Sequence, residues 1–141
     1  MTASRTQVDA HALLEQHAAK ARFAPAPPAS ATTLPAAYDV QHAFVALMLA
    51  REGPVAGYKI GLTSPRMQAL CGIDQPISGV VLARRVRRSG VTLTRRAYGR
   101  LGLEFEIAMR IGRDAPGAEH TAHGIRAHVD AVCAGIVRQR S

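Results

Sequence analysis

The stretch Leu101-Gly102-Leu103-Glu104-Phe105-Glu106-Ile107-Ala108-Met109 alternates large apolar residues with small or acidic ones. This period of two predicts a β-strand, because successive side chains of a strand point to opposite faces. One face then carries the large apolar side chains, and the other carries Glu104 and Glu106. Residues two apart on a strand are separated by roughly 6.5 to 7 Å, so both carboxylates can reach one divalent cation.

Two interpretations of Glu104 and Glu106 are open at this point. As metal ligands, their oxygen atoms favour a hard cation such as Mg²⁺ or Mn²⁺. Alternatively, they are ordinary surface residues of a half-solvated edge strand. Gly102 and Ala108 share their face and leave space beside the acids, which favours a ligand pocket.

A second alternating stretch lies upstream, at residues 55–62. It predicts a strand with Gly57, Lys59 and Gly61 on one face and with Tyr58, Ile60 and Leu62 packed on the other. Lys59 is one of only two lysines among 18 basic residues. An amine is a compact donor that can lose its proton, which a guanidinium cannot do. The alternative is a lysine that extends from the strand end into solvent.

The composition indicates an ordinary globular protein. The chain has 141 residues, of which 48% are hydrophobic, enough for one domain with a core. No apolar run has the length of a membrane helix and the N-terminal residues do not form a signal peptide, so we expect a cytoplasmic protein without membrane partners. Cys71 and Cys133 lack metal-site or redox spacing and are expected to be buried free thiols.

The formal net charge of +8 raises the question of nucleic-acid binding. The densest basic segment is Arg84-Arg85-Val86-Arg87-Arg88, followed by Arg95 and Arg96. No aromatic residues alternate with these arginines for base stacking, and no nucleic-acid-binding motif is present. We therefore expect no nucleic-acid partner, and a basic rim that attracts an anionic small molecule explains the same residues.

Local patterns predict the remaining elements. Helices are expected at residues 6–23, 34–52, 63–72 and 125–137. Short strands are expected at 80–82 and 91–94, and loops at 24–30, 73–79 and 112–123.

Four motifs in register resemble one known family. They are Tyr38-Asp39-Val40-Gln41, Gly57-Tyr58-Lys59-Ile60-Gly61-Leu62-Thr63-Ser64, Asp74-Gln75-Pro76 with Gly79, and Glu104-Phe105-Glu106-Ile107-Ala108. Together they are similar to the 2-oxopent-4-enoate (2-hydroxypenta-2,4-dienoate) hydratase and 4-oxalocrotonate decarboxylase family of the fumarylacetoacetate hydrolase superfamily. The resemblance extends from about residue 38 to residue 136.

The resemblance implies an α+β fold. N-terminal helices, residues 1–54, precede a curved mixed β-sheet core of the fumarylacetoacetate hydrolase type. Residues 55–141 form part of that core as one structural unit, and the core is incomplete at the C-terminus.

The resemblance also implies a metal-dependent hydro-lyase. Such an enzyme, with Mg²⁺ or Mn²⁺, hydrates 2-hydroxy-2,4-dienoates such as 2-oxopent-4-enoate in aromatic meta-cleavage catabolism, through a metal-stabilised enolate. Glu104 and Glu106 correspond to metal ligands, and Lys59 to a catalytic residue that also binds substrate. Gly57, Gly61 and Gln75 are the other expected substrate-binding residues. Decarboxylation of a 4-oxalocrotonate-type 2-oxo acid is the alternative activity, since the two share these motifs.

The chain departs from the family pattern near its C-terminus. Family members are longer, and their third metal carboxylate follows a segment equivalent to residues 128–136, so it would fall at Val137. The chain instead closes with Arg138-Gln139-Arg140-Ser141, which suggests truncation or a shifted reading frame. Ile77 also stands where many relatives carry an acid. The expected consequences are exposed sheet edges and association with identical or paralogous subunits, and an inactive fragment is a further alternative.

Overall fold

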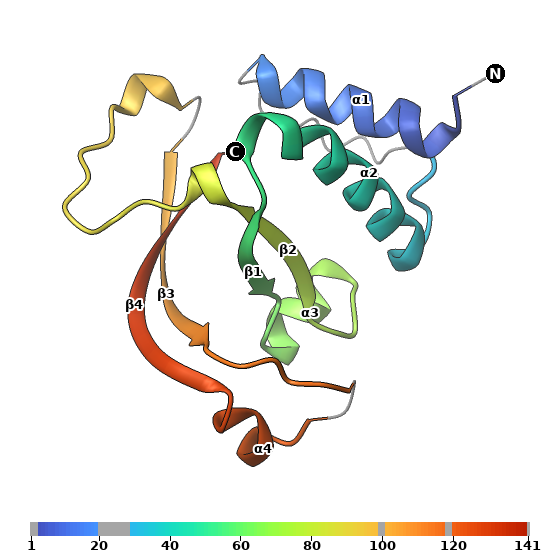
Figure 1. Cartoon of the computed structure of the whole chain (residues 1–141). Helices are drawn as coiled ribbons and strands as arrows, with labels where there is room; N and C mark the ends of the chain where they lie inside the picture. The colour runs from blue at the N-terminus through green and yellow to red at the C-terminus, as the bar shows by residue number, and fades with distance from the viewer. Residues whose placement is uncertain (1–2, 20–28, 99–100, 118–119, 141) are drawn as a thin grey trace. The chain divides into compact units, whose positions relative to one another are not determined.

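The computed structural model describes residues 3–19, 29–98, 101–117 and 120–140 (Figure 1). The chain divides into two compact units, residues 1–94 and 95–141. The domain boundary expected from the sequence, between residues 54 and 55, falls inside the first unit. Each unit is described by itself below.

Two helices open the first unit. Helix α1 (Arg5–Ala18) begins with a capping box, in which Ser4 and Gln7 each bond the other's backbone N–H. Helix α2 (Leu34–Glu52) begins at Thr33, whose side chain accepts a hydrogen bond from the backbone N–H of Ala36. The two helices lie against each other. Both were predicted, although the end of the first prediction, residues 20–23, lies outside the described residues.

Helix α2 contributes two residues to a small core. Val40 and Met48 of α2 are buried together with Ala10 of α1 and Leu82. A further contact comes from Asp9 of α1, which accepts hydrogen bonds from the backbone N–H of Ser30 at 2.9 Å and from the Ser30 hydroxyl. These contacts hold α1 against the chain segment that leads into α2.

The lysine strand is present as β1 (Val55–Gly61), and it pairs antiparallel with β2 (Ile77–Leu82). Helix α3 (Pro65–Cys71) connects them, capped by Ser64 and ended by Gly72 in the left-handed conformation with φ 66°. Helix α3 confirms the prediction for residues 63–72. The predicted loop 73–79 is wrong at its end, because β2 already starts at Ile77 opposite Gly61.

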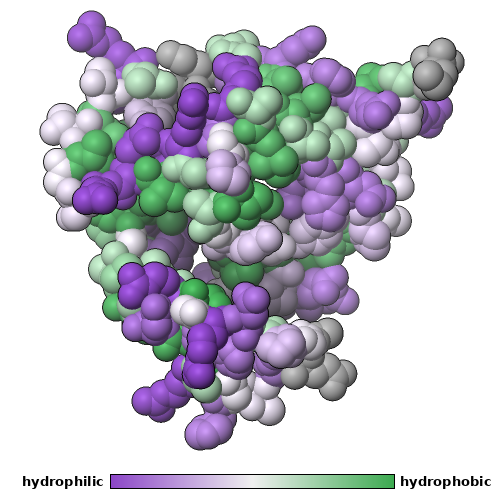
Figure 2. Space-filling model, in the orientation of Figure 1, coloured by the Kyte–Doolittle hydropathy of each residue, from purple (hydrophilic) through white to green (hydrophobic). Residues whose placement is uncertain are grey.

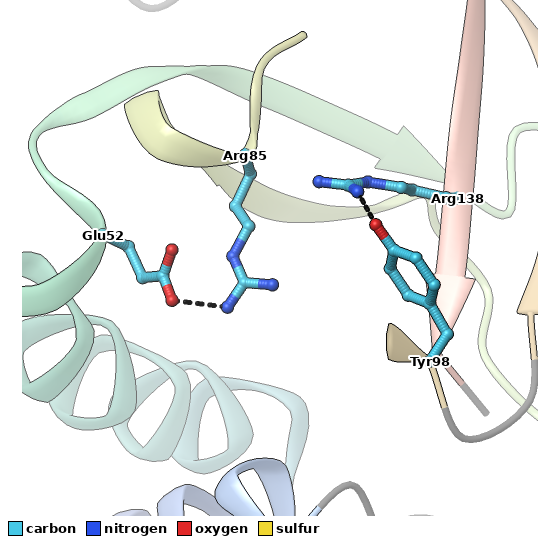
Figure 3. A network of polar contacts seen from close by, with 4 residues as sticks. All are labelled: Glu52, Arg85, Tyr98 and Arg138. Carbon is cyan, nitrogen blue, oxygen red and sulfur yellow. Dashed lines mark hydrogen bonds and ion pairs between the residues drawn. The ribbon is translucent and has the colours of Figure 1, made fainter. Parts of the chain in front are cut away.

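The segment after β2 contains two single-turn 3-10 helices, η1 (Ala83–Arg85) and η2 (Arg95–Ala97). Arg85 of η1 forms an ion pair of 2.6 Å with Glu52 at the end of α2 (Figure 3). The strand predicted at 91–94 is wrong. Its alternating residues have strand propensity, but no strand of the described residues pairs with them, and an unpaired strand leaves its backbone groups unsatisfied.

The second unit is built on the glutamate strand, β3 (Leu101–Ile111), which pairs antiparallel with β4 (Val129–Arg140). Helix α4 (Ala122–Arg126) lies between them and is capped by Thr121. The helix predicted at 125–137 is therefore wrong over most of its length. Its alanines suit a helix, but Val129, Val132 and Ile136 are β-branched, and pairing with the distant β3 decides the conformation.

Two side-chain pairs stabilise the second unit. Arg110 and Asp130 form an ion pair of 2.7 Å at the end of the β3–β4 pair that is nearer to α4 in the chain. The hydrogen bond to Asp130 raises the pKa of Arg110. Arg138 of β4 donates a hydrogen bond to the hydroxyl of Tyr98, and its guanidinium lies 5.2 Å from the centre of the Tyr98 ring (Figure 3).

Many large apolar side chains stay exposed in both units. Apolar residues reach the surface in several places on the side shown in Figure 2. Tyr58 and Ile60 of β1 are exposed, so the prediction that they pack against a core is wrong. Alternation determines which residues share a face but not which face becomes covered. Cys71 and Cys133 are free as expected, but they are exposed rather than buried.

These elements confirm the α+β class. Among the described residues, the strands form two separate two-stranded antiparallel sheets. A curved mixed core of the fumarylacetoacetate hydrolase type remains a prediction. No helix in the described ranges has the length and apolar character needed to cross a membrane.

Candidate functional site

Glu104 and Glu106 lie on one face of β3, as the alternation predicted, and we call this side of the β3–β4 pair the glutamate face. Residues directly opposite each other on paired strands share a face. Glu104 is opposite Val137, and Glu106 is opposite Gly135. The face therefore has two acids on β3 and small or apolar residues on β4, which leaves room beside the acids.

The two glutamates differ in their exposure to water. Glu104 is half-buried, and its Oε2 atom is inaccessible to solvent, whereas Glu106 is exposed. The two carboxylates of this face therefore lie in different surroundings, one partly desolvated and one in water. Glu106 can add a second oxygen ligand from the solvent side of the same strand face.

Val137 of β4 lies on the glutamate face. The resemblance places a third acid at this residue, and the register puts Val137 directly across from Glu104. Cβ atoms of opposite residues are about 4.5 to 5.5 Å apart. An acid at position 137 would therefore join Glu104 and Glu106 on the same surface. The sequence patterns do not predict that position 137 faces Glu104, because they predict a helix at residues 125–137.

The described residues contain two adjacent carboxylates suited to a hard cation, but no group of three acidic, histidine or cysteine residues placed to hold a metal ion. A pair of carboxylates is still a chemically suitable partial ligand set for Mg²⁺ or Mn²⁺, since Mg²⁺ usually keeps several water ligands. The metal assignment of Glu104 and Glu106 remains a prediction.

Lys59 lies in the first unit, on the half-buried face of β1. Its neighbours on that face are Gly57 and Gly61 along the strand, and Gly79 directly opposite on β2. A Cβ atom built at Gly57 or Gly79 would meet nothing within 4 Å. The backbone is therefore uncovered at two of the glycines beside Lys59, a setting that allows a small ligand to approach the strand closely there.

Gln75, the remaining predicted substrate-binding residue, is exposed in the bend that precedes β2. The strand begins two residues later, at Ile77, which is opposite Gly61. Gln75 therefore lies two residues before the position of β2 that faces Gly61. Ile77, where the resemblance implies an acid, is half-buried, and a Cβ atom built at Gly61 would lie 3.5 Å from its Cγ1 atom.

The turn after Gly61 adopts an unusual backbone conformation. Leu62 has a φ of 54°, in the left-handed region that non-glycine residues rarely adopt. The side-chain amide of Gln68 donates a hydrogen bond of 2.7 Å to the Leu62 carbonyl and holds the turn in place. This turn joins the lysine strand to the Ser64 cap of α3, so it contributes to the position of the strand end.

Two side chains of α2 hold the open edge of β2. The hydroxyl of Tyr38 accepts a hydrogen bond of 2.9 Å from the backbone N–H of Ser78, and Gln41 donates one of 3.1 Å to the Ser78 carbonyl. Hydrogen bonds from the Ser78 side chain and then its backbone lower the pKa of Tyr38. Sequence reasoning did not assign this role, although the spacing of three residues on a helix indicates a shared face.

Comparisons with known proteins agree with the motifs. No family model matches the chain. Two curated proteins of Dechloromonas aromatica named 2-keto-4-pentenoate hydratase 1 and 2 are 40% and 39% identical to it over 88 residues. The TodF product hydratase of Pseudomonas putida is 36% identical over 90 residues, which cover 64% of this chain and 34% of that protein.

The chain thus spans about a third of the length of the curated relatives it matches. The alignments with the two Dechloromonas proteins cover 60% of this chain and 32% of each relative. The comparisons therefore confirm that this chain resembles the 2-keto-4-pentenoate hydratase family over the aligned part of its sequence.

Proposed function

We propose that this chain carries part of a divalent-metal-dependent hydratase that acts on 2-hydroxy-2,4-dienoates such as 2-oxopent-4-enoate. The observation that carries the proposal is the glutamate face, where Glu104 and Glu106 lie side by side on β3 opposite Val137. The names of the relatives support the same reaction.

In this proposal, the carboxylates of Glu104 and Glu106 hold Mg²⁺ or Mn²⁺, with Glu104 as the less solvated ligand. When bound, the cation supplies Lewis acidity that polarises the carbonyl oxygen of a 2-oxo acid. The small residues around the acids, Gly102, Ala108 and Gly135, keep the face accessible to a flat substrate.

Lys59 is assigned a separate task on β1. Its ammonium group can donate hydrogen bonds to the carboxylate of a small 2-oxo acid, with Gly57 and Gly61 allowing close approach. An amine with an adjustable proton affinity can also transfer a proton at Nζ during hydration of the diene. Gln75 supplies a neutral donor or acceptor near the Gly61 end of the strand.

Calorimetric titration of the 141-residue chain with Mn²⁺ and Mg²⁺, with and without oxalate, tests the metal site. Oxalate serves as a probe because it presents two adjacent oxygen-donor groups, as a 2-oxo acid does. We expect Glu104→Gln and Glu106→Gln each to weaken metal binding at least about tenfold, since each removes a charged ligand. Glu15→Gln, which removes the same charge from the exposed side of α1, serves as the matched control.

Hydration itself is measured by the loss of dienoate ultraviolet absorbance, because adding water breaks the conjugation. Turnover that depends on Mn²⁺ and disappears in both glutamine variants supports the proposal. A folded chain that binds neither metal nor oxalate contradicts it and identifies the chain as an inactive fragment. Carbon dioxide release from a 2-oxo dienoate without hydration would instead assign the decarboxylase reaction.

A further inference from the structure

Helix α2 is hydrogen-bonded to β2 through both backbone groups of one residue, Ser78. The backbone N–H of Ser78 donates to the hydroxyl of Tyr38 at 2.9 Å, and its carbonyl accepts from the side-chain amide of Gln41 at 3.1 Å. All three residues are half-buried, in surroundings where a hydrogen bond is electrostatically stronger than in water. The backbone of β2 is therefore held to α2 by two bonds at this one residue.

A second polar contact attaches α2 beyond the other end of β2. Glu52 is the last residue of α2, and it forms the ion pair of 2.6 Å with Arg85, three residues after β2 ends (Figure 3). Ser78 is the second residue of β2, so the two attachments flank most of the strand. The strand cannot slide along the helix without breaking one of these contacts.

Lys59 depends on β2 for its position. It lies on β1 directly opposite Gly79, the residue that follows Ser78. Among the described strands, β2 is the only partner of β1. Gly79 has no side chain that could hold β1 by packing, and a Cβ atom built there would meet nothing within 4 Å. The backbone pairing of the two strands therefore transmits the position of Ser78 to Lys59.

We propose that Tyr38 and Gln41 are positioning residues for the amine of Lys59. By holding Ser78, they fix the backbone of Gly79 beside Lys59 and so determine where the amine meets a small carboxylate. They act through the backbone of β2 and not through contact with the ligand. This inference rests on the proposed role of Lys59 in binding the carboxylate of a 2-oxo acid.

A purely structural role of the two side chains makes a different prediction. The same hydrogen bonds satisfy backbone groups at the open edge of β2, and they would stabilise the fold without any ligand at Lys59. Loss of either bond would then lower the free energy of unfolding but leave Lys59 unchanged in the molecules that stay folded. Stability and the surroundings of Lys59 must therefore be measured separately.

Carbon-13 NMR of the full chain, labelled at the lysine Cε atoms, reports on Lys59 directly. The sequence has only two lysines, Lys20 and Lys59, so two signals are expected, and Lys59→Arg assigns them. The pH titration of each signal gives the pKa of its amine. Titration with pyruvate, a small 2-oxo acid, gives the dissociation constant, and urea unfolding of the same samples gives the stability.

Tyr38→Phe removes the hydroxyl but keeps the ring, and Gln41→Met removes the amide at similar length. Each is expected to shift the Lys59 signal and its titration and to weaken pyruvate binding at least about fivefold, without changing the Lys20 signal. Tyr58→Phe is the matched control. It removes the same group from a side chain that is 73% exposed and lies on the other face of β1 from Lys59.

Two results would overturn the proposal. In one, Tyr38→Phe and Gln41→Met both leave the Lys59 signal and titration as in the parent chain, whatever their effect on urea unfolding. In the other, Tyr58→Phe changes the Lys59 signal as much as Tyr38→Phe does. A parent chain that binds no pyruvate would refute the ligand role of Lys59 in the proposed function. The Lys59 titration would then still decide the positioning role, since a shift in Tyr38→Phe supports it and an unchanged titration contradicts it.

Discussion

Replacing Val137 with aspartate tests whether the glutamate face is a metal site that lacks one ligand. The new carboxylate would stand directly opposite Glu104 and diagonal to Glu106. Without metal, three acids repel one another, and like charges directly opposite on a sheet cost about 0.2 to 1 kcal/mol. Loss of the half-buried valine adds about 0.7 kcal/mol. We therefore expect Val137→Asp to lower the free energy of unfolding by about 1 to 2 kcal/mol in the absence of metal.

Bound metal should reverse this loss. A third carboxylate is expected to tighten Mn²⁺ binding at least about tenfold, because affinity for hard cations rises with the number of charged ligands. At a metal concentration about 100 times the dissociation constant, binding stabilises the folded chain by about 2.7 kcal/mol, more than the substitution costs. Val137→Asp should thus unfold more easily than the parent without metal and less easily with Mn²⁺.

Calorimetric titration and chemical denaturation with and without Mn²⁺ measure both effects. Ile136→Asp is the matched control, since it adds the same charge one residue away but on the opposite face of the β3–β4 pair. Equal Mn²⁺ affinity of Val137→Asp and the parent would refute the reasoning. An equal gain in Ile136→Asp would also refute it, because general attraction to negative charge would then explain the binding.

Two further outcomes follow from local contacts. Gly112→Ala should lower the free energy of unfolding, measured in urea, by about 1 to 3 kcal/mol, because the added Cβ would lie 2.8 Å from Cβ of Asp130. Gly79→Ala is the control and should not cause this loss, because a Cβ at Gly79 would meet nothing within 4 Å. Hydrogen bonds from the Ser30 side chain, and then from its backbone, lower the pKa of Asp9 below the usual value of 3.8. The Asp9–Ser30 contact therefore stabilises the fold fully above pH 3.8, and this stabilisation is lost as the pH falls through the lowered pKa. Asp9→Asn should make the free energy of unfolding less dependent on pH in this acid range. An unchanged dependence on pH would contradict the role of Asp9.

The strands and helices that sequence patterns predicted well are those whose signals are local. Capping residues and a proline in the first turn mark α2 and α3, and strict alternation marks β1 and β3. The segment 125–137 failed because its alanines and its β-branched residues favour different structures, and only a distant partner strand decides between them. The same rule explains residues 91–94, which alternate but have no partner among the described strands.

In the candidate site, too, relations between nearby residues were predictable from the sequence. Glu104 and Glu106 could be placed together from the sequence, since their common face follows from the period of a strand, and so could Lys59 with Gly57 and Gly61. The motif resemblance was likewise readable from the residues alone, and the curated hydratases confirm it. All of these relations hold between residues within a few positions of one another.

Only tertiary structure decided what lies across from those residues. Antiparallel register set Val137 opposite Glu104 and Gly79 opposite Lys59, over separations of 33 and 20 residues that no local period encodes. It also brought Tyr38 and Gln41 to the edge of β2, and left Phe105 and Tyr58 exposed although their pattern suggested burial. The physical reason is that alternation determines the direction of a side chain, whereas burial and cross-strand partners depend on which other elements pack against it.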